Sequence, residues 1–238
     1  SNKKFLDKIS DEEALKLMIS EHQKSADSVM DNLQNIKTII EIITVKLKKS
    51  NSSRLVYVGA GTSGRLGLQD GIELHPTFGW PLERLEFLLA GGYDSLIKPV
   101  EKAEDNIKDA IKIFRQKKIN SKDVVIGLAA SGNTPFTCEI LRLSQQKKAT
   151  TIAISNNPKG KILSLGEYSI ILNTKKEVLA GSTRLKAGTA QKICLNVIST
   201  LVMTKLGYVK NGMMSNLVAT NEKLLKRQKF IKNKIAIK

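Results

Sequence analysis

Five short apolar segments recur along the chain, separated by longer segments with helical periodicity. They read "RLVYVGA", "RLEFLLAGG", "DVVIGLAAS", "TTIAISNN" and "YSIILNT". Continuous apolar runs, as opposed to alternating ones, are typical of strands that are buried on both faces. The pattern therefore predicts an α/β fold, a three-layer α/β/α sandwich in which a five-stranded parallel sheet lies between two layers of helices.

The expected sheet is flanked by two helical segments. Residues 1–50 predict an N-terminal helical arm, in which Ser10 and Glu13 form a capping-box pattern. Residues 51–212 predict the α/β domain, and residues 213–238 a C-terminal helical segment rich in lysine. A chain of 238 residues, 41% of them hydrophobic, suits one α/β domain with such additions, and two domains are the next choice.

Several classes of protein are disfavoured by the composition. No stretch reaches the roughly 18 apolar residues that a membrane span needs, and no secretory signal peptide is visible. Cys138 and Cys194 lack the spacing of a metal site or a disulfide framework. We therefore expect no membrane association, no bound metal and a reducing, cytoplasmic location.

The net charge of +17 favours a negatively charged binding partner, either a nucleic acid or a small anion. Such a surplus is found in nucleic-acid-binding proteins, and it also attracts small anions. Lysines are spread along the chain, and only the tail from Lys223 is rich in them. Aromatic residues make up just 5% of the chain, so few side chains are available to stack on nucleic-acid bases. We expect a small anionic ligand and no nucleic acid, the ordinary alternative being a lysine-rich solvated surface.

Two segments that follow strands combine glycine with small polar side chains. The first contains Gly61, Thr62, Ser63 and Gly64, and the second contains Ser131, Gly132, Asn133 and Thr134. Ligands of parallel sheets bind beyond the carboxyl ends of the strands. Helix N-termini there favour anions, and hydroxyl groups add donors for phosphate oxygens. The segments predict phosphate and sugar contacts, unless they are only tight turns.

A dinucleotide site is the competing interpretation of the first segment, because "GAGTSG" satisfies G-x-G-x-x-G. Such a site also needs an acidic residue near the end of the next strand, whereas Glu86 lies towards its middle. The hydroxyl pattern recurs after a second strand, which favours a sugar phosphate.

A third segment, "AGSTRLKAGTAQK" at residues 180–192, begins a long helix. Ser182 or Thr183 is expected to cap this helix. Arg184 and Lys186 place positive charge near its N-terminus, where cations oppose the helix dipole. We expect Lys186 to contact a bound anion, the alternative being that both cations are simply exposed.

Several of these stretches together resemble the bacterial N-acetylmuramic acid 6-phosphate etherases, within the sugar isomerase (SIS) domain superfamily. The stretches are "VYVGAGTSGRLGLQDGIELHPTFG", "EKAEDN", "GLAASGNTPF", "STRLKAGTAQK" and "ATNEKLLKRQ", and the likeness runs from about residue 5 to 235. The resemblance implies a homodimer that uses no cofactor. It also implies cleavage of the C3 ether of N-acetylmuramic acid 6-phosphate, a peptidoglycan sugar, to D-lactate and N-acetylglucosamine 6-phosphate.

The resemblance also implies two catalytic glutamates. Glu73 matches the family's acid, which protonates the departing lactyl oxygen, and Glu104 matches the base at C2. The residue pattern alone does not separate Glu104 from Glu101 or Asp105. Two departures stand out: His75 lies two residues from Glu73, and Asn133 stands where the family commonly has arginine.

Two further functions fit the same superfamily. A non-catalytic sugar-phosphate sensor, like the glucokinase regulatory proteins of animals, would bind the sugar and release no lactate. An aldose–ketose phosphosugar isomerase would also exchange the C2 proton, but it would form a ketose.

Overall fold

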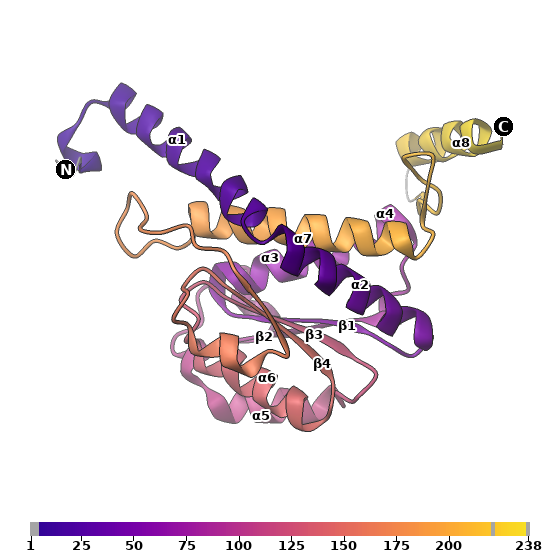
Figure 1. Ribbon diagram of the computed structural model, residues 1–238, viewed down its shortest axis with the longest axis horizontal. Helices are drawn as coiled ribbons and strands as arrows, with labels where there is room; N and C mark the ends of the chain where they lie inside the picture. The colour runs from indigo at the N-terminus through magenta and orange to yellow at the C-terminus, as the bar shows by residue number, and fades with distance from the viewer. Residues whose placement is uncertain (1–4, 220–221, 237–238) are drawn as a thin grey trace.

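Five parallel strands form the central sheet, in the order β2-β1-β3-β4-β5 (Figure 1). The computed structural model describes residues 5–219 and 222–236. The strands are β1 (Leu55–Gly59), β2 (Leu85–Leu89), β3 (Val124–Ala129), β4 (Thr150–Ser155) and β5 (Tyr168–Ile171). All five coincide with the apolar segments of the sequence, which confirms the predicted three-layer sandwich.

Burial on both faces explains the continuous apolar runs. In β1, Leu55 and Tyr57 belong to the core cluster on one face of the sheet, and Val56 and Val58 belong to the cluster on the other. Successive side chains of a strand point to opposite faces, so both sets must be apolar.

The helices form a layer on each face of this sheet (Figure 1). They are α1 (Asp11–Met30), α2 (Leu33–Lys49), α3 (Gly61–Ile72), α4 (Leu74–Phe78), α5 (Ile107–Gln116), α6 (Pro135–Gln146), α7 (Lys186–Lys205) and α8 (Glu222–Ala236). Helices α2, α3 and α7 cover one face, and α5 and α6 cover the other. None of the helices in the described ranges is long and apolar enough to cross a membrane.

Short elements complete the chain. They are the 3-10 helices η1 (Leu6–Lys8), η2 (Leu82–Arg84), η3 (Tyr93–Leu96), η4 (Ala103–Asp105) and η5 (Lys161–Leu165), and the antiparallel pair β6 (Val209–Lys210) and β7 (Met213–Met214).

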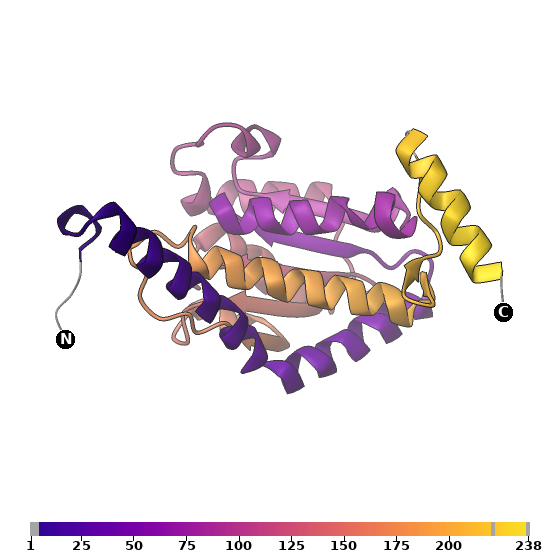
Figure 2. The same cartoon turned by 90° about the horizontal axis from the view of Figure 1, so that it is seen from above.

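The first fifty residues form two different helices. Ser10 caps α1, because its hydroxyl accepts a hydrogen bond from the Glu13 backbone N–H at 3.3 Å, which confirms the predicted cap. The first half of α1 projects beyond the body, whereas α2 packs on the sheet through Ile36 and Ile43 (Figure 2). How the chain divides into domains stays a prediction.

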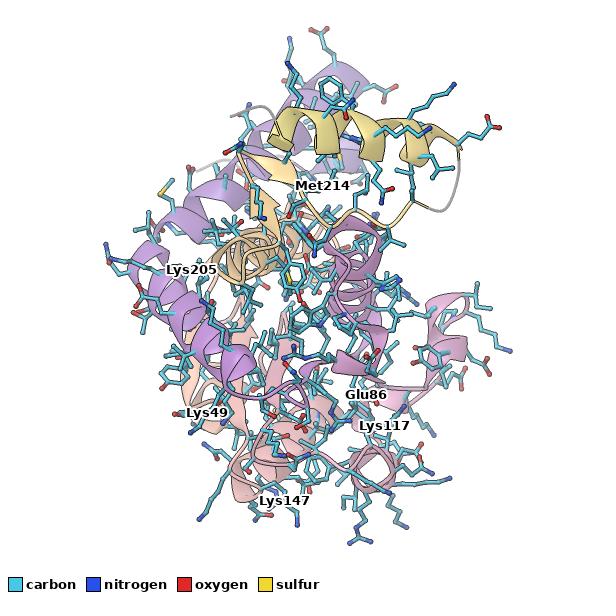
Figure 3. All side chains as sticks on the ribbon, turned by 90° about the vertical axis from the view of Figure 1, so that its right-hand side faces the viewer. Lys49, Glu86, Lys117, Lys147, Lys205 and Met214 are labelled. Atoms are coloured by element: carbon cyan, nitrogen blue, oxygen red, sulfur yellow. The ribbon has the colours of Figure 1, made fainter. Side chains whose placement is uncertain are left out.

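The amino-terminal ends of the strands carry structural ion pairs. Glu86 in β2 pairs with Lys117 at 2.9 Å, and both residues are labelled in Figure 3. Arg54 pairs with Asp123 at 2.7 Å. Glu86 is therefore engaged far from the edge where a ribose would bind, in agreement with the sequence argument against a dinucleotide site.

The segment between β2 and β3 is helical mainly in its second half. Helix α5 begins only at Ile107, because the Asn106 side chain accepts a hydrogen bond from the Asp109 backbone N–H at 3.1 Å and caps it there. The residues before it form η3, η4 and loops. Glu104 consequently lies on a short 3-10 helix.

Candidate functional site

The loop after β1 brings α3 into direct contact with the strand. Gly61 is exposed and begins the helix, Thr62 is half-buried and Ser63 is buried. A Cβ at Gly64 would lie 2.9 Å from backbone atoms of Gly59, so only glycine allows this approach. The N-cap residue of α3 is an alanine, which offers no side-chain acceptor to the N–H groups of the first turn. These groups suit an anion.

The loop after β3 is built around Gly132. Its φ of +73° lies in the left-handed region, and a Cβ there would lie 2.4 Å from the Gly160 Cα atom. The Ser131 hydroxyl accepts a hydrogen bond from the Asn133 backbone N–H at 3.2 Å. Helix α6 follows, with Thr134 as its N-cap residue and proline at the first position, where its missing N–H costs no helical hydrogen bond. Thr134 makes no side-chain cap bond.

Helices α3 and α7 begin side by side. A Cβ at Gly188, in the first turn of α7, would lie 3.4 Å from the Thr62 side chain. Both loops and the start of α7 therefore meet at the carboxyl ends of the strands. The sequence-predicted phosphate contacts of the β1 and β3 loops are brought to this one edge.

The N-terminus of α7 is capped by Glu177, and the predicted caps Ser182 and Thr183 are wrong. One carboxylate oxygen of Glu177 accepts from the Ala187 N–H at 2.9 Å, and the other accepts from the Lys186 N–H at 3.3 Å. The residue before the helix, Leu185, makes no cap bond. Sequence reasoning missed Glu177 because it lies nine residues before the helix that it caps.

Lys186 is buried, with 2% of its surface exposed. Its ammonium group pairs with the Glu21 carboxylate of α1, and its carbonyl accepts from the Ser25 hydroxyl at 3.0 Å. Hydrogen bonds from Lys186 and then Lys24 lower the pKa of Glu21 below its ordinary value. A contact between Lys186 and a substrate stays a prediction, and it requires this ion pair to open.

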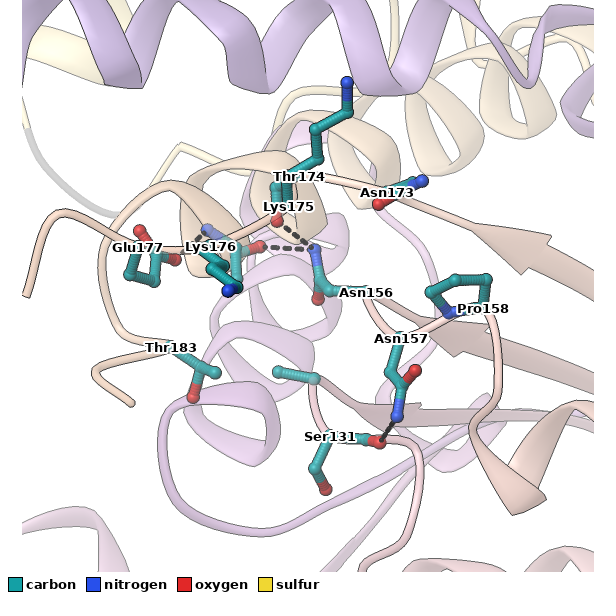
Figure 4. A pocket seen from close by; sticks show the side chains of 12 residues that line it. Ser131, Asn156, Asn157, Pro158, Asn173, Thr174, Lys175, Lys176, Glu177 and Thr183 are labelled. Atoms are coloured by element: carbon teal, nitrogen blue, oxygen red, sulfur yellow. Dashed lines mark hydrogen bonds between the residues drawn. The ribbon is translucent and has the colours of Figure 1, made fainter. Parts of the chain in front are cut away.

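A pocket of about 360 Å³ lies beside these loops (Figure 4). Ser131 and Asn157 line one side, and Glu177 and Thr183 line the other. Its floor includes Asn156, whose amide group donates to the Leu172 carbonyl at 3.0 Å and to the Ala187 carbonyl at 3.3 Å. Two of these lining residues, Ser131 and Asn157, are also joined by a hydrogen bond of 2.9 Å from the Asn157 side chain to the Ser131 carbonyl.

The structure separates the two predicted catalytic glutamates. Glu104 is exposed on η4, which packs against α6 at the carboxyl edge of the sheet. Glu73 is exposed at the far end of α3, which has 12 residues. At about 1.5 Å per residue, that helix places Glu73 roughly 18 Å from Gly61. One chain thus places Glu104 near the end of β2, where a Cβ at Gly91 would lie 3.2 Å from Ala103, and it places Glu73 at the distant end of α3.

His75, two residues after Glu73, has a structural contact. Its Nδ1 atom lies 2.9 Å from the Trp80 carbonyl oxygen. The described residues contain no group of three or more His, Cys, Asp or Glu side chains arranged to hold a metal ion.

Two family models match parts of the chain. The glucokinase regulatory protein N-terminal SIS domain matches residues 36–145, and the SIS domain matches residues 107–201. Both matches include the loop after β3.

Curated relatives match over nearly the whole chain. The N-acetylmuramic acid 6-phosphate etherase of Francisella philomiragia is 45% identical over 230 residues, which cover 95% of this chain and 76% of the relative. The enzyme of the same name from a Geobacillus species is 42% identical over 226 residues, which cover 95% of this chain and 76% of that relative. That of Mycoplasma mycoides is 40% identical over 222 residues, with shares of 93% and 73%.

Solved structures share the fold at low identity. A protein of Escherichia coli CFT073, solved with a bound ligand, has a TM-score of 0.60 and 12% identity, over 86% of this chain and 97% of that one. The C-terminal domain of glucosamine-fructose-6-phosphate aminotransferase from Francisella tularensis has a TM-score of 0.56 and 15% identity, over 92% and 53%. These likenesses support the sheet order and its helix layers.

Proposed function

The chain belongs to the N-acetylmuramic acid 6-phosphate etherase family, and we propose on this basis that it cleaves the C3 lactyl ether of that sugar. The products are N-acetylglucosamine 6-phosphate and D-lactate, released in the recycling of peptidoglycan amino sugars. The observation that carries the proposal is 45% identity to an etherase over 95% of the chain. The two hydroxyl-bearing loops at one edge of the sheet support it.

The proposed chemistry is an elimination followed by a hydration. The C1 aldehyde of the open-chain sugar acidifies the C2 hydrogen, which Glu104 removes as a base. Glu73 gives its proton to the lactyl oxygen as the C3–O bond breaks, leaving a C2–C3 double bond. Water then adds, with its hydroxyl going to C3 and a proton returning to C2. Two carboxyl groups in opposite protonation states suit this sequence of transfers.

The phosphate of the substrate is proposed to bind at the loops after β1 and β3. Hydroxyl groups at these loops come from Thr62, Ser63, Ser131 and Thr134. The first turns of α3 and α6 add backbone N–H groups. These loops keep the phosphate fixed while the sugar carbon atoms face Glu104.

A homodimer forms part of the proposal, because one chain leaves Glu73 at the wrong end of α3. A second copy would bring its Glu73 to the site that holds Glu104. The projecting part of α1 supports association, since Leu15 and Ile19 lie one turn apart and are 60% and 61% exposed. We place the enzyme in the cytoplasm, where the free thiols of Cys138 and Cys194 stay reduced.

Proton NMR in heavy water with N-acetylmuramic acid 6-phosphate tests the function. The wild type should release lactate and exchange deuterium into C2. Glu104→Gln should slow both by about a hundredfold or more, since it removes the base. Glu73→Gln should slow lactate release while C2 exchange continues. Glu101→Gln is the matched control, an exposed acid three residues from Glu104, and it should behave like the wild type.

A sugar-phosphate regulator is the second candidate, favoured by the match of residues 36–145 to the glucokinase regulatory protein domain. Saturable binding without lactate release or C2 exchange would establish the regulator and reject the etherase. C2 exchange with formation of a ketose would instead identify an isomerase.

A further inference from the structure

The loop that follows β4 packs directly on the loop that follows β3. The Gly132 carbonyl accepts a hydrogen bond from the Ile162 N–H at 2.8 Å, and the Ser131 carbonyl accepts from the Asn157 side chain at 2.9 Å. Gly132 and Gly160 are so close that a Cβ on either one would overlap the other's Cα. The two loops therefore form one rigid unit.

This packing places Lys161 beside the Ser131–Thr134 loop. Lys161 is the first residue of η5, and its backbone N–H donates to the Asn133 Oδ1 atom at 3.0 Å. The side-chain oxygen of Asn133 is thereby turned towards the lysine backbone. The Ser131–Thr134 loop itself contains hydroxyl groups, an amide and backbone N–H groups, and no cation.

The charge of Lys161 acts on the first turns of α6. Burial raises the pKa of the Cys138 thiol, and Lys161 opposes that rise. The pKa of Glu139 is lowered chiefly by its hydrogen bonds with Arg142, with a further contribution from Lys161. Glu139 is held by Arg142 at 2.6 and 2.8 Å, and no carboxylate of the described ranges forms an ion pair with Lys161.

We propose that Lys161 supplies the positive charge that binds the substrate's phosphate at the Ser131–Thr134 loop. This inference rests on the proposed function, since it concerns the same phosphate. A phosphate monoester is close to doubly charged at neutral pH. Hydroxyl groups and N–H groups orient its oxygens, and a lysine ammonium adds a charge-assisted bond. Lys161 is an exposed residue, and the hydrogen bond from its backbone N–H to Asn133 ties it to the Ser131–Thr134 loop.

Binding of N-acetylglucosamine 6-phosphate, measured by calorimetry, tests the inference. Lys161→Met should weaken the affinity about tenfold, the size of one lost charge-assisted bond. Lys159→Met is the matched control, since it removes an exposed lysine of the same loop, and it should change the affinity less than about twofold. Lys161→Arg should keep most of the affinity, and thermal unfolding of each variant checks that the fold is intact.

A second variant tests whether the positive charge itself is what binds the phosphate. The double variant Asn133→Arg with Lys161→Met replaces the lost lysine charge with an arginine charge on the Ser131–Thr134 loop. It should recover most of the affinity that Lys161→Met loses. The wild type should also lose affinity between low and high salt more steeply than Lys161→Met does, since it has one charge more in the contact.

Equal affinities of the wild type and Lys161→Met would overturn the inference, as would equal losses in the Lys161 and Lys159 variants. So would a wild type that binds neither N-acetylglucosamine 6-phosphate nor inorganic phosphate. A wild type that binds the sugar phosphate and releases no lactate would reject the etherase alone, and the affinity comparison would still decide the role of Lys161.

Discussion

At the scale of single residues, Asp70 shows how α3 and α7 are joined. Its carboxylate accepts hydrogen bonds from the Asn196 amide at 2.8 Å, the Ser199 hydroxyl at 3.0 Å and the Tyr57 hydroxyl at 3.1 Å. Burial raises the pKa of Asp70 above its ordinary value, although these three donors and Lys192 favour the charged form. The group therefore binds a proton more tightly in the folded chain than in the unfolded one.

This shift predicts how stability depends on pH. As pH rises from about 4, the unfolded chain loses its Asp70 proton first, so folding becomes less favourable until the folded group has also ionised. Asp70→Asn keeps an acceptor for Asn196 and Ser199 and can donate to Tyr57. It should raise the unfolding free energy at pH 7 by on the order of 1 kcal/mol, or a few degrees in Tm.

Thermal unfolding of both proteins from pH 3.5 to 7.5 measures this effect. The difference in Tm should vanish at the acid end and grow with pH. A variant that is less stable than the wild type at pH 7 would show that the charged carboxylate stabilises the fold there.

At the scale of elements, the start of α7 depends on a distant side chain. The segment of residues 173–185 leaves β5, crosses the carboxyl edge and returns to α7, with Glu177 bonded to the first two N–H groups of the helix. An acid at a helix N-terminus satisfies free donors and matches the helix dipole. Glu177 therefore anchors the segment that forms one wall of the pocket.

Glu177→Ala is predicted to loosen this segment. It removes both acceptors, so the unfolding free energy should fall by about 1 kcal/mol, and trypsin should cut faster at Lys175, Lys176 or Arg184. Glu177→Gln keeps one acceptor oxygen, so its stability and its rate of cleavage should lie between those of the wild type and Glu177→Ala. Urea unfolding and timed proteolysis measure these effects, with Glu101→Ala as a control for the loss of an exposed acid. Unchanged cleavage in Glu177→Ala would show that the segment is held by its other contacts.

At the scale of the whole molecule, the distance along α3 bears on the proposed dimer. Glu73 and Gly61 lie at opposite ends of this helix, so the proposed site with both glutamates takes its Glu73 from a second copy. In a two-fold dimer the exchange is reciprocal, and each chain gives one glutamate to each of two sites.

Mixing two inactive variants tests this arrangement. Glu73→Gln and Glu104→Gln dimers that are unfolded and refolded together should regain up to about a quarter of the wild-type lactate release. Half of the dimers are then mixed, and one of their two sites has both glutamates intact. Each variant refolded alone is the control. No recovery, with mixed dimers present by mass spectrometry, would place both glutamates of a site in the same chain.

The architecture and the positions of the two loops that follow β1 and β3 are predictable from the amino-acid sequence. The five apolar runs predict five strands because most side chains of a strand that is buried on both faces must be apolar. Gly61–Gly64 and Ser131–Thr134 could be placed at one edge because parallel strands all end on the same side. The Ser10 cap was predictable for a similar reason, since its partner lies three residues away.

The contacts between residues far apart in the sequence become visible only in the folded chain. Glu177 caps α7, Lys186 pairs with Glu21 and Lys161 reaches the β3 loop, and each contact joins residues that the local pattern does not connect. Glu73 shows the converse, since it follows the β1 loop closely in sequence while the length of α3 places it at the opposite end of that helix. Periodicity and turn chemistry act over a few residues, whereas these contacts depend on how whole elements pack.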